Sequence, residues 1–335
     1  MVDSKQYLEA LDTTLRYIVD TRLHDEDGFG LMLRYAMGWL NADGTPYHQP
    51  SGKRLRPLLL FLCAEAAHGD WRKALPAAAA VELLHNFSLI HDDIQDKSET
   101  RHNRPTVWKI WGIANAINAG DAMFTLAYQA LESLSSSLSA EQMLYLWRAF
   151  NVTNIELTRG QHLDMRFETQ ATVAIADYIS MIKGKSAALI ATSAMFGAFI
   201  PTASSTLAEH YASFGLNLGI AFQIHDDILG IWGDPSLTGK SVATDIVSRK
   251  KSLPVLYGLE QSQEIAEMYA HSELNEGDVR VIVEHLTQLG AKEYTEQQEL
   301  AYYTKAQEAL ALAHPRQEAQ AALDAFVAFL FKRSY

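Results

Sequence analysis

The chain has 335 residues, of which 48% are hydrophobic and 20% charged, and its formal net charge is −12. This apolar fraction supports a substantial core and argues against wholesale disorder, while the acidic balance argues against a broad nucleic-acid-binding surface. The only cysteine, Cys63, excludes an intramolecular disulfide, and its apolar neighbours favour a buried thiol in a reducing, cytoplasmic setting.

The pattern of apolar residues is helical throughout. Nine prolines and 19 glycines leave long stretches rich in good helix formers, and apolar residues recur every three or four positions. No run of alternating strand residues with hairpin turns is present. We therefore predict an all-α fold, one domain over residues 1–335, built as a helical bundle around a central cavity. The expected helices cover residues 4–23, 28–40, 54–68, 73–97, 106–136, 140–168, 175–199, 204–232 and 250–265, followed by shorter ones.

No segment of the sequence predicts membrane insertion. The N-terminus is polar and lacks the apolar stretch of a secretory signal. The apolar stretch Ala187–Pro201 is shorter than the roughly 20 residues that a membrane span needs. We expect it to form a buried helix.

The first motif along the chain is basic. The segment Gly52–Pro57 places Lys53, Arg54 and Arg56 just ahead of a strongly apolar helix. Clustered cations near a helix N-terminus suit an anionic ligand. An ordinary charged loop is the alternative interpretation.

The second motif is a cluster of aspartates at the end of an apolar helix. Asp92 and Asp96 are four residues apart, so a helix places both carboxylates on one face, with Asp93 beside them. Like charges this close repel one another and raise each other's pKa unless a cation neutralises them. Mg²⁺ is typically bound by one or two carboxylates together with phosphate oxygens.

A related cluster follows later, at the end of another apolar helix. Asp226 and Asp227 again come directly after a histidine, but Gly230 stands where a carboxylate would complete the four-residue spacing. Asp234 follows from a loop and carries less weight. Two such clusters predict two walls of a metal–diphosphate site, whereas one alone would be read as a solvated acidic helix end.

Further cations accompany these clusters. Arg101 and Arg104 flank His102 after the first cluster, and Lys185 lies in the segment Lys183–Ser186. Lys240 and the run Arg249–Lys251 follow the second cluster. Each one alone is read as surface charge, but together they provide the local positive charge that bound diphosphates require.

These motifs resemble the isoprenyl diphosphate synthases, the trans-prenyltransferases that make geranyl, farnesyl, geranylgeranyl and longer diphosphates. The resemblance runs from Gly52 to Pro254 in family order and spacing. It includes Gly-Lys-Arg-Leu-Arg-Pro, Asp-Asp-x-x-Asp, Gly-Gln-x-x-Asp with Gln161 and Asp164, Gly-Lys-Ser and Phe-Gln-x-x-Asp-Asp.

The resemblance implies a role for each residue. Mg²⁺, about three ions per active site, would be bound by Asp92, Asp96 and Asp226, with Asp93 and Asp227 supporting them. The allylic diphosphate would be held by Arg101, Lys185, Ser186, Gln223, Lys240 and Lys250. Isopentenyl diphosphate would be held by Lys53, Arg56, His85 and His102. Of these residues, Asp92, Asp96, Arg101, Lys185, Asp226 and Lys240 are expected to act in catalysis. The family is also typically homodimeric, without stable membrane insertion.

The sequence departs from the family pattern at two positions. His102 replaces an arginine that normally contacts isopentenyl diphosphate, and Arg104 is a possible substitute. Gly230 replaces the last carboxylate of the second cluster, as in a known bacterial subgroup.

The residues just before the first cluster bear on product length. In the family they floor the tunnel that holds the growing chain, and here Phe87 and Ser88 stand five and four residues before Asp92. One bulky aromatic resembles the short-chain pattern. It favours a C20 product, geranylgeranyl diphosphate, with C15 next, made from dimethylallyl, geranyl or farnesyl diphosphate. Phe87 as ordinary core is the alternative.

Two other functions share some of these sequence features. A class I terpene cyclase is also all-α with an aspartate-rich motif, but it needs no isopentenyl site, so Lys53, Arg56 and His85 argue against it. A non-catalytic partner subunit of another synthase tends to lose the first aspartate cluster, which is intact here.

Overall fold

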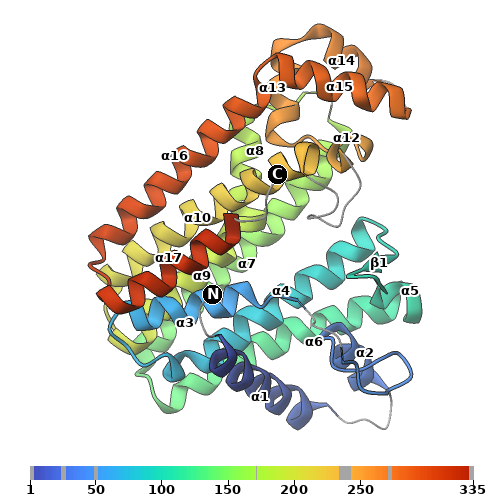
Figure 1. Cartoon of the computed structure of the whole chain (residues 1–335). Helices are drawn as coiled ribbons and strands as arrows, with labels where there is room; N and C mark the ends of the chain where they lie inside the picture. Colours follow the sequence, from blue (N-terminus) through green and yellow to red (C-terminus); the bar gives the residue numbers. More distant parts are fainter. Residues whose placement is uncertain are drawn as a thin grey trace. The chain divides into compact units, whose positions relative to one another are not determined.

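The computed structural model describes residues 4–23, 28–48, 52–170, 172–233, 243–270 and 274–331. Nearly all of their regular structure is helical, which confirms the all-α prediction (Figure 1). The elements are α1 (Lys5–Arg22), α2 (Phe29–Ala36), α3 (Leu55–Ala66), η1 (Trp71–Ala74), α4 (Leu75–Gln95), β1 (Thr100–Arg101), β2 (Arg104–Pro105), α5 (Val107–Trp111), α6 (Ile113–Glu132), η2 (Ser133–Ser136), α7 (Ala140–Thr169), α8 (Ile175–Ile182), η3 (Lys183–Ala187), α9 (Ala188–Thr202), α10 (Ser205–Trp232), α12 (Thr244–Val247), α13 (Leu253–Gln261), α14 (Gln263–Ala270), α15 (Glu276–Gln288), α16 (Ala291–Leu312) and α17 (Gln317–Phe331).

Most expected helices lie within a few residues of their predicted bounds, and two differences have a clear local cause. The expected helix 106–136 is divided into α5 and α6 at Gly112, whose φ of +83° no helix can accommodate. The expected helix 250–265 begins at Leu253, because Pro254 suits the first turn of a helix. Lys250 therefore precedes the helix and is not part of it.

A short hairpin was not predicted. Strands β1 and β2 are antiparallel, with Arg101 opposite Arg104. The two residues between them, His102 and Asn103, both have positive φ values, 51° and 60°. Two left-handed residues make the tight turn whose twist matches a hairpin. The hairpin is too short for the alternating pattern that identifies strands in a sequence.

The chain forms two compact units. The N-terminal unit contains Val2–Ala149 and Ser193–Ala208, and the C-terminal unit contains Phe150–Thr192 and Glu209–Tyr335. Helices α7, α9 and α10 contribute residues to both. A single domain and a central cavity remain predictions.

The core of the N-terminal unit rests on close helix packing around α4. The four residues Ala77–Ala80 of α4 are fully buried, and α4 packs along α6. At the far end of α4, Gly120 of α6 lies directly against the ring of His91, where an added Cβ would collide with that ring. Small residues thus allow the two helices to approach closely.

Among the described residues, the core of the C-terminal unit includes two apolar clusters that share α10. One contains Tyr178, Ile224 and Leu253, and the other contains Ile231 and Val255 among its members. Because α10 contributes to both, its C-terminal half, which carries the second aspartate motif, is anchored in packed side chains.

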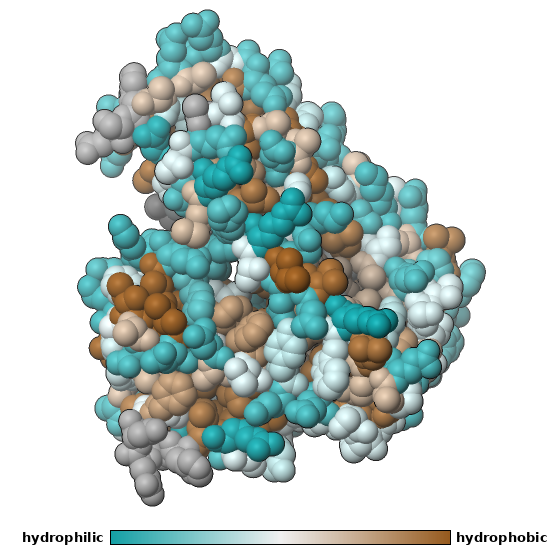
Figure 2. All heavy atoms as spheres, turned by 180° about the vertical axis from the view of Figure 1, so that it is seen from behind, coloured by the Kyte–Doolittle hydropathy of each residue, from teal (hydrophilic) through white to brown (hydrophobic). Residues whose placement is uncertain are grey.

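Figure 2 shows one face of the molecule, on which polar side chains dominate and apolar ones form separate patches. Exposed apolar residues recur along α6 and α7: Ile113, Ile117, Leu144, Trp147, Val152 and Ile155. Among the described helices, none combines the length and apolarity needed to cross a bilayer.

Candidate active site

The first aspartate motif occupies the C-terminal turn of α4. The Asp96 N–H donates to the Asp92 carbonyl at 2.8 Å, so the two residues lie one turn apart on the same face. Asp92 is half-buried and Asp96 is exposed, whereas Asp93 is only 5% exposed. The helix end therefore presents two carboxylates outward and holds the third inside.

The buried member of this motif is bound to an arginine. Arg101 Nε donates to Asp93 Oδ1 at 2.9 Å, because the hairpin folds β1 back towards the end of α4. Burial raises the pKa of Asp93, and the neighbouring Arg101 opposes that rise. The pair fixes Arg101 beside the two outward carboxylates.

A second basic group lies between α3 and the middle of α4. Arg56 Nη1 and His85 Nε2 are 3.1 Å apart. A guanidinium can only donate, so Nε2 must accept, and the neutral ring carries its proton on Nδ1. Burial, followed by the charge of Arg56, lowers the pKa of His85 well below its ordinary value. Two of the three residues expected to bind isopentenyl diphosphate from this region are thus in contact.

Other cations of the N-terminal unit have different surroundings. Lys53 is exposed, but Arg54 forms an ion pair with Glu82 and donates to a carbonyl of α2's C-terminal cap at 3.2 Å. Arg104 donates to the carbonyl of Leu40 at 2.8 Å and stacks on two tyrosine rings at 4.0 Å. These contacts favour a structural role for Arg104. His102 is exposed at the hairpin turn.

Phe87 belongs to a row of aromatic rings between α4 and α6. Its ring lies 5.0 Å from that of Phe124, which lies 5.1 Å from that of Tyr128. Ser88 is buried and its hydroxyl donates to the carbonyl of His85 at 2.8 Å. Phe87 is therefore backed by a second aromatic residue, which the sequence pattern near the aspartates does not reveal.

In the C-terminal unit, two glycines bring α7 against a π-turn, η3. A Cβ at Gly160 would lie 2.7 Å from the Lys185 Cα, and one at Gly184 would lie 2.5 Å from the Glu156 carbonyl oxygen. This contact between backbones places Lys185 in an ion pair with Asp164. A π-turn inside a helix often marks a functional site.

The second aspartate motif again has one buried, fully engaged member. Asp227 is 0% exposed. Its oxygens accept from the Tyr178 hydroxyl, the Leu253 N–H at 3.0 Å and Gln223 Nε2 at 3.3 Å, and Lys250 Nζ lies 3.7 Å away. Burial raises the pKa of Asp227, and Lys250 opposes that rise. These contacts favour a supporting role for Asp227, since its protein bonds use both oxygens.

Lys250 lies in a strongly negative field. Its ammonium interacts with Asp227, Asp245, Asp164 and Asp226, which raise its pKa above the ordinary value against the effect of burial. Asp226 itself is half-buried. Within the part of the chain that the structure describes, Lys185 and Lys250 interact with the carboxylates of Asp164, Asp226, Asp227 and Asp245, a grouping of acidic oxygens that suits a divalent cation.

Gln223 links Ser186, next to Lys185, with Asp227. The Ser186 hydroxyl donates to Gln223 Oε1 at 2.7 Å, while the amide nitrogen of Gln223 donates to Asp227.

Two further residues named from the sequence, Asp234 and Lys240, lie outside the described residues.

The two motifs have the same local plan. In each, the first aspartate is half-buried, while the second is buried and bound by a cation, Arg101 in one and Lys250 in the other. The expected metal ligands in both motifs are carboxylate oxygens. Mg²⁺ prefers oxygen ligands, so these residues fit that ion. Within the described ranges, no three His, Cys, Asp or Glu side chains converge closely enough to bind a metal by themselves.

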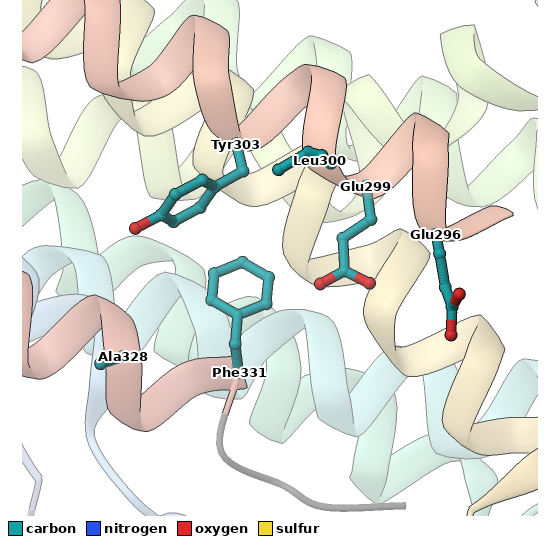
Figure 3. A pocket seen from close by; sticks show the side chains of 6 residues that line it. All are labelled: Glu296, Glu299, Leu300, Tyr303, Ala328 and Phe331. Carbon is teal, nitrogen blue, oxygen red and sulfur yellow. The ribbon is translucent and has the colours of Figure 1, made fainter. Parts of the chain in front are cut away.

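The histidine that precedes the second aspartate motif, His225, is held in place by its packing contacts. His225 is 3% exposed, with its Nδ1 3.3 Å from Glu299 of α16 and its ring edge-on to Phe331 of α17 at 5.4 Å. Glu299 and Phe331 also line a pocket of about 310 Å³ between these two helices, together with Glu296, Leu300, Tyr303 and Ala328 (Figure 3). The C-terminal helices therefore hold the residue that immediately precedes Asp226.

Three residues of the site were not identified from the sequence. Tyr178 and Asp245 contribute to the surroundings of Asp227 and Lys250, and Phe124 supports Phe87. Tyr178 and Phe124 have no short-range signal, because each lies on a different helix from its partner. Only Asp245, which lies in the segment between Lys240 and Lys250, had a position that suggested a role.

Comparisons with known proteins show the family of this chain. A model of the family "Polyprenyl synthetase" matches residues 38–286. The chain is 43% identical over 249 residues to a (2E,6E)-farnesyl diphosphate synthase of Mycobacterium bovis, covering 74% of this chain and 67% of the relative. It is 41% identical over 235 residues to a geranylgeranyl diphosphate synthase of Mycobacterium tuberculosis, covering 70% of this chain and 66% of the relative.

Solved structures show the same likeness over nearly the whole length. A polyprenyl synthetase from Streptomyces coelicolor matches with a TM-score of 0.89 and 32% identity, covering 97% of this chain and 98% of that one. A geranylgeranyl pyrophosphate synthase from Corynebacterium glutamicum, solved with isoprenyl diphosphate and magnesium, matches with a TM-score of 0.83 and 28% identity, covering 99% and 100%. The chain therefore belongs to the polyprenyl synthetase family, the trans-isoprenyl diphosphate synthases.

Proposed function

We propose that this chain is a short-chain trans-prenyltransferase that condenses isopentenyl diphosphate with an allylic diphosphate and releases pyrophosphate. The observation that carries the proposal is the arrangement that the two aspartate motifs share. In each motif a buried aspartate forms an ion pair with a basic side chain, Arg101 or Lys250. Family membership supports the same reaction, and no feature favours the terpene cyclase.

Magnesium is the expected cofactor, with about three ions per active site. Asp92, Asp96 and Asp226 would bind it, and Asp93 and Asp227, whose contacts are made within the protein, would orient their neighbours. When bound, the ion neutralises charge on the diphosphate and so stabilises it as a leaving group. Magnesium in the Corynebacterium neighbour supports this choice.

The cations divide between two anions. Arg101, Lys185 and Lys250 would hold the allylic diphosphate, assisted by Ser186 and Gln223, and Lys240 is proposed there from its sequence position alone. Lys53, Arg56, His85 and His102 would hold isopentenyl diphosphate. The contact between Arg56 and His85 supports the second group, since it brings two of its members together.

The reaction needs one bond broken and one formed. The allylic C–O bond breaks, its electron pair leaves with pyrophosphate, and the double bond of isopentenyl diphosphate attacks the allylic carbon. A proton then leaves the adjacent carbon, and the released pyrophosphate is the proposed acceptor. The chain's part is to hold both diphosphates, to stabilise the departing charge through Arg101 and Lys185, and to exclude water from the cation.

We propose geranylgeranyl diphosphate, C20, as the main product, with farnesyl diphosphate, C15, as the next candidate. Phe87 would limit the chain, and its ring contact with Phe124 supports a rigid block. The curated relatives include synthases of both lengths.

The test is direct. Purified protein is incubated with Mg²⁺, isopentenyl diphosphate and dimethylallyl, geranyl or farnesyl diphosphate in turn, and products are sized by mass spectrometry. Growth in five-carbon steps, ending mainly at C20, is the expected result. Hydrocarbon released from a single allylic diphosphate without isopentenyl diphosphate would show a cyclase instead.

We also propose a cytoplasmic homodimer that folds as one domain. The exposed apolar residues of α7, Leu144, Trp147, Val152 and Ile155, recur at helical spacing and support a partner face there. The buried thiol of Cys63 suits a reducing compartment.

The dimer is tested by light scattering, which should give twice the chain mass. Trp147→Glu should shift the measured mass to that of the monomer. A single unfolding transition is expected of one domain.

A further inference from the structure

The missing carboxylate of the second motif has a neighbour in three dimensions. Gly230 lies one helical turn after Asp226 on α10, where a side chain would share the face of Asp226. A Cβ at position 230 would lie 2.5 Å from Cγ of Asp245 and 2.6 and 2.7 Å from its two oxygens. The carboxylate of Asp245, from α12, therefore occupies the space that a side chain at 230 would need.

Asp245 is an unusual acid for a structural position. It is 8% exposed, and among the described residues its Oδ2 has no hydrogen-bond partner. A buried carboxylate oxygen without such a partner is costly. Asp227, close by, shows the contrast, because it accepts hydrogen bonds from a tyrosine, an amide side chain and a backbone N–H.

A counter-charge to Lys250 is the simplest structural explanation, but it accounts for little. Lys250 Nζ lies 4.0 Å from Asp245 Oδ2, too far for a hydrogen bond, and lies nearer, at 3.7 Å, to Asp227. One ammonium cannot neutralise both carboxylates. In the first motif, Asp96 provides a carboxylate one turn after Asp92. The second motif has Gly230 at the equivalent position and so has no such carboxylate of its own.

We propose that Asp245 supplies to the divalent-cation site the carboxylate that position 230 lacks, and that Gly230 is required because it makes room for it. This inference rests on the proposed function, since the cation is the one that binds the diphosphate. It assigns a ligand or water-mediated ligand to a helix that lies outside both aspartate motifs.

The test exchanges the two positions. Mn²⁺ binding is measured by electron paramagnetic resonance in the presence of inorganic pyrophosphate, and the melting temperature is recorded for each variant. The variants are Asp245→Asn, Gly230→Asp, and the exchange Gly230→Asp/Asp245→Ala. Asp177→Asn, which removes an exposed carboxylate from α8 of the same unit, is the matched control.

We expect Asp245→Asn to weaken Mn²⁺ binding about tenfold or more, as loss of a metal-supporting carboxylate typically does, with the control unchanged. Gly230→Asp should lower the melting temperature through its clash with Asp245, and the exchange should restore most of the Mn²⁺ affinity that Asp245→Asn loses. Asp245→Asn with wild-type Mn²⁺ affinity would overturn the inference, even if the exchange variant fails to fold.

The outcome is separable from that of the proposed function. Wild-type protein that elongates allylic diphosphates while Asp245→Asn keeps its Mn²⁺ affinity defeats the inference alone. Wild-type protein that binds Mn²⁺ with pyrophosphate but forms no longer prenyl chain defeats the proposed function, and the Mn²⁺ titrations of the variants still decide the role of Asp245.

Discussion

Replacing Tyr178 by phenylalanine removes a single hydroxyl from the most deeply buried part of the second aspartate motif. That hydroxyl donates to Asp227, which is 0% exposed and so cannot recover the lost bond from water. The ring keeps its shape, so no cavity forms. A hydrogen bond to a charged group contributes about 1.5–3 kcal/mol, and this is the expected loss in the free energy of unfolding.

The size of the melting shift follows from chain length. With an unfolding entropy of about 2.1 cal/mol/K per residue, 335 residues give about 0.7 kcal/mol/K. The expected decrease in melting temperature of Tyr178→Phe is therefore about 2–4 °C at neutral pH. Differential scanning calorimetry measures it.

The pH dependence identifies the cause. Burial raises the pKa of Asp227 above its unfolded value, and the tyrosine hydroxyl opposes that rise. The folded state therefore holds this proton to higher pH than the unfolded state, and the group's contribution to stability decreases as pH rises from the unfolded pKa through the folded one. Without the hydroxyl the folded pKa rises further, so the deficit of Tyr178→Phe should shrink on acidification, where Asp227 is neutral in both proteins.

Tyr269 provides a matched control. It is also a buried tyrosine of the C-terminal unit, but its hydroxyl has no hydrogen-bond partner among the described residues. Tyr269→Phe should leave the melting temperature unchanged or raise it slightly. A deficit of Tyr178→Phe that stays constant throughout acidification, or that Tyr269→Phe matches, would refute the charged hydrogen bond as its source.

Three further predictions concern other parts of the site. Phe87→Ala should lengthen the main product by at least one five-carbon unit in the mass-spectrometric assay, and an unchanged product would remove Phe87 as the block. Gly160→Ala should lower the free energy of unfolding by about 1–3 kcal/mol, because the added Cβ would push on the backbone of Lys185. A melting temperature equal to that of the wild type would show that the π-turn can move. His85 has a lowered pKa, so the unfolded state takes up this proton first as pH falls, and the contribution of His85 to stability should rise with pH up to about 6.5 and then level off. His85→Gln, which can still accept from Arg56, should lose that slope in melts between pH 5 and 8.

Local sequence patterns were sufficient for the helices and for the motifs they carry. Apolar spacing predicted α4 and α10, and the four-residue spacing of Asp92 and Asp96 predicted that they share a face, because both are properties of neighbouring residues on one helix. The break at Gly112 was missed, because a glycine inside an apolar pattern signals a break only through its φ.

The tertiary structure decided which member of each motif lies inside and what holds it. Asp93 and Asp227 read like their neighbours in the sequence, yet both are buried and bound to a cation. Those partners come from a hairpin and from a loop ahead of α13, so only the folded chain brings them together.

The composition and short-range spacing by themselves predicted an all-helical protein with clustered aspartates at two helix ends, and the motifs on those helices carried the resemblance to the family. Only the tertiary structure shows that the Tyr178 hydroxyl donates to Asp227, that the Asp245 carboxylate fills the space beside Gly230, and that the ring of Phe124 lies against Phe87. The physical reason is that helical periodicity is a local property that can be read along the chain. A hydrogen bond or a steric exclusion between different helices depends on packing distances that no spacing along the chain encodes.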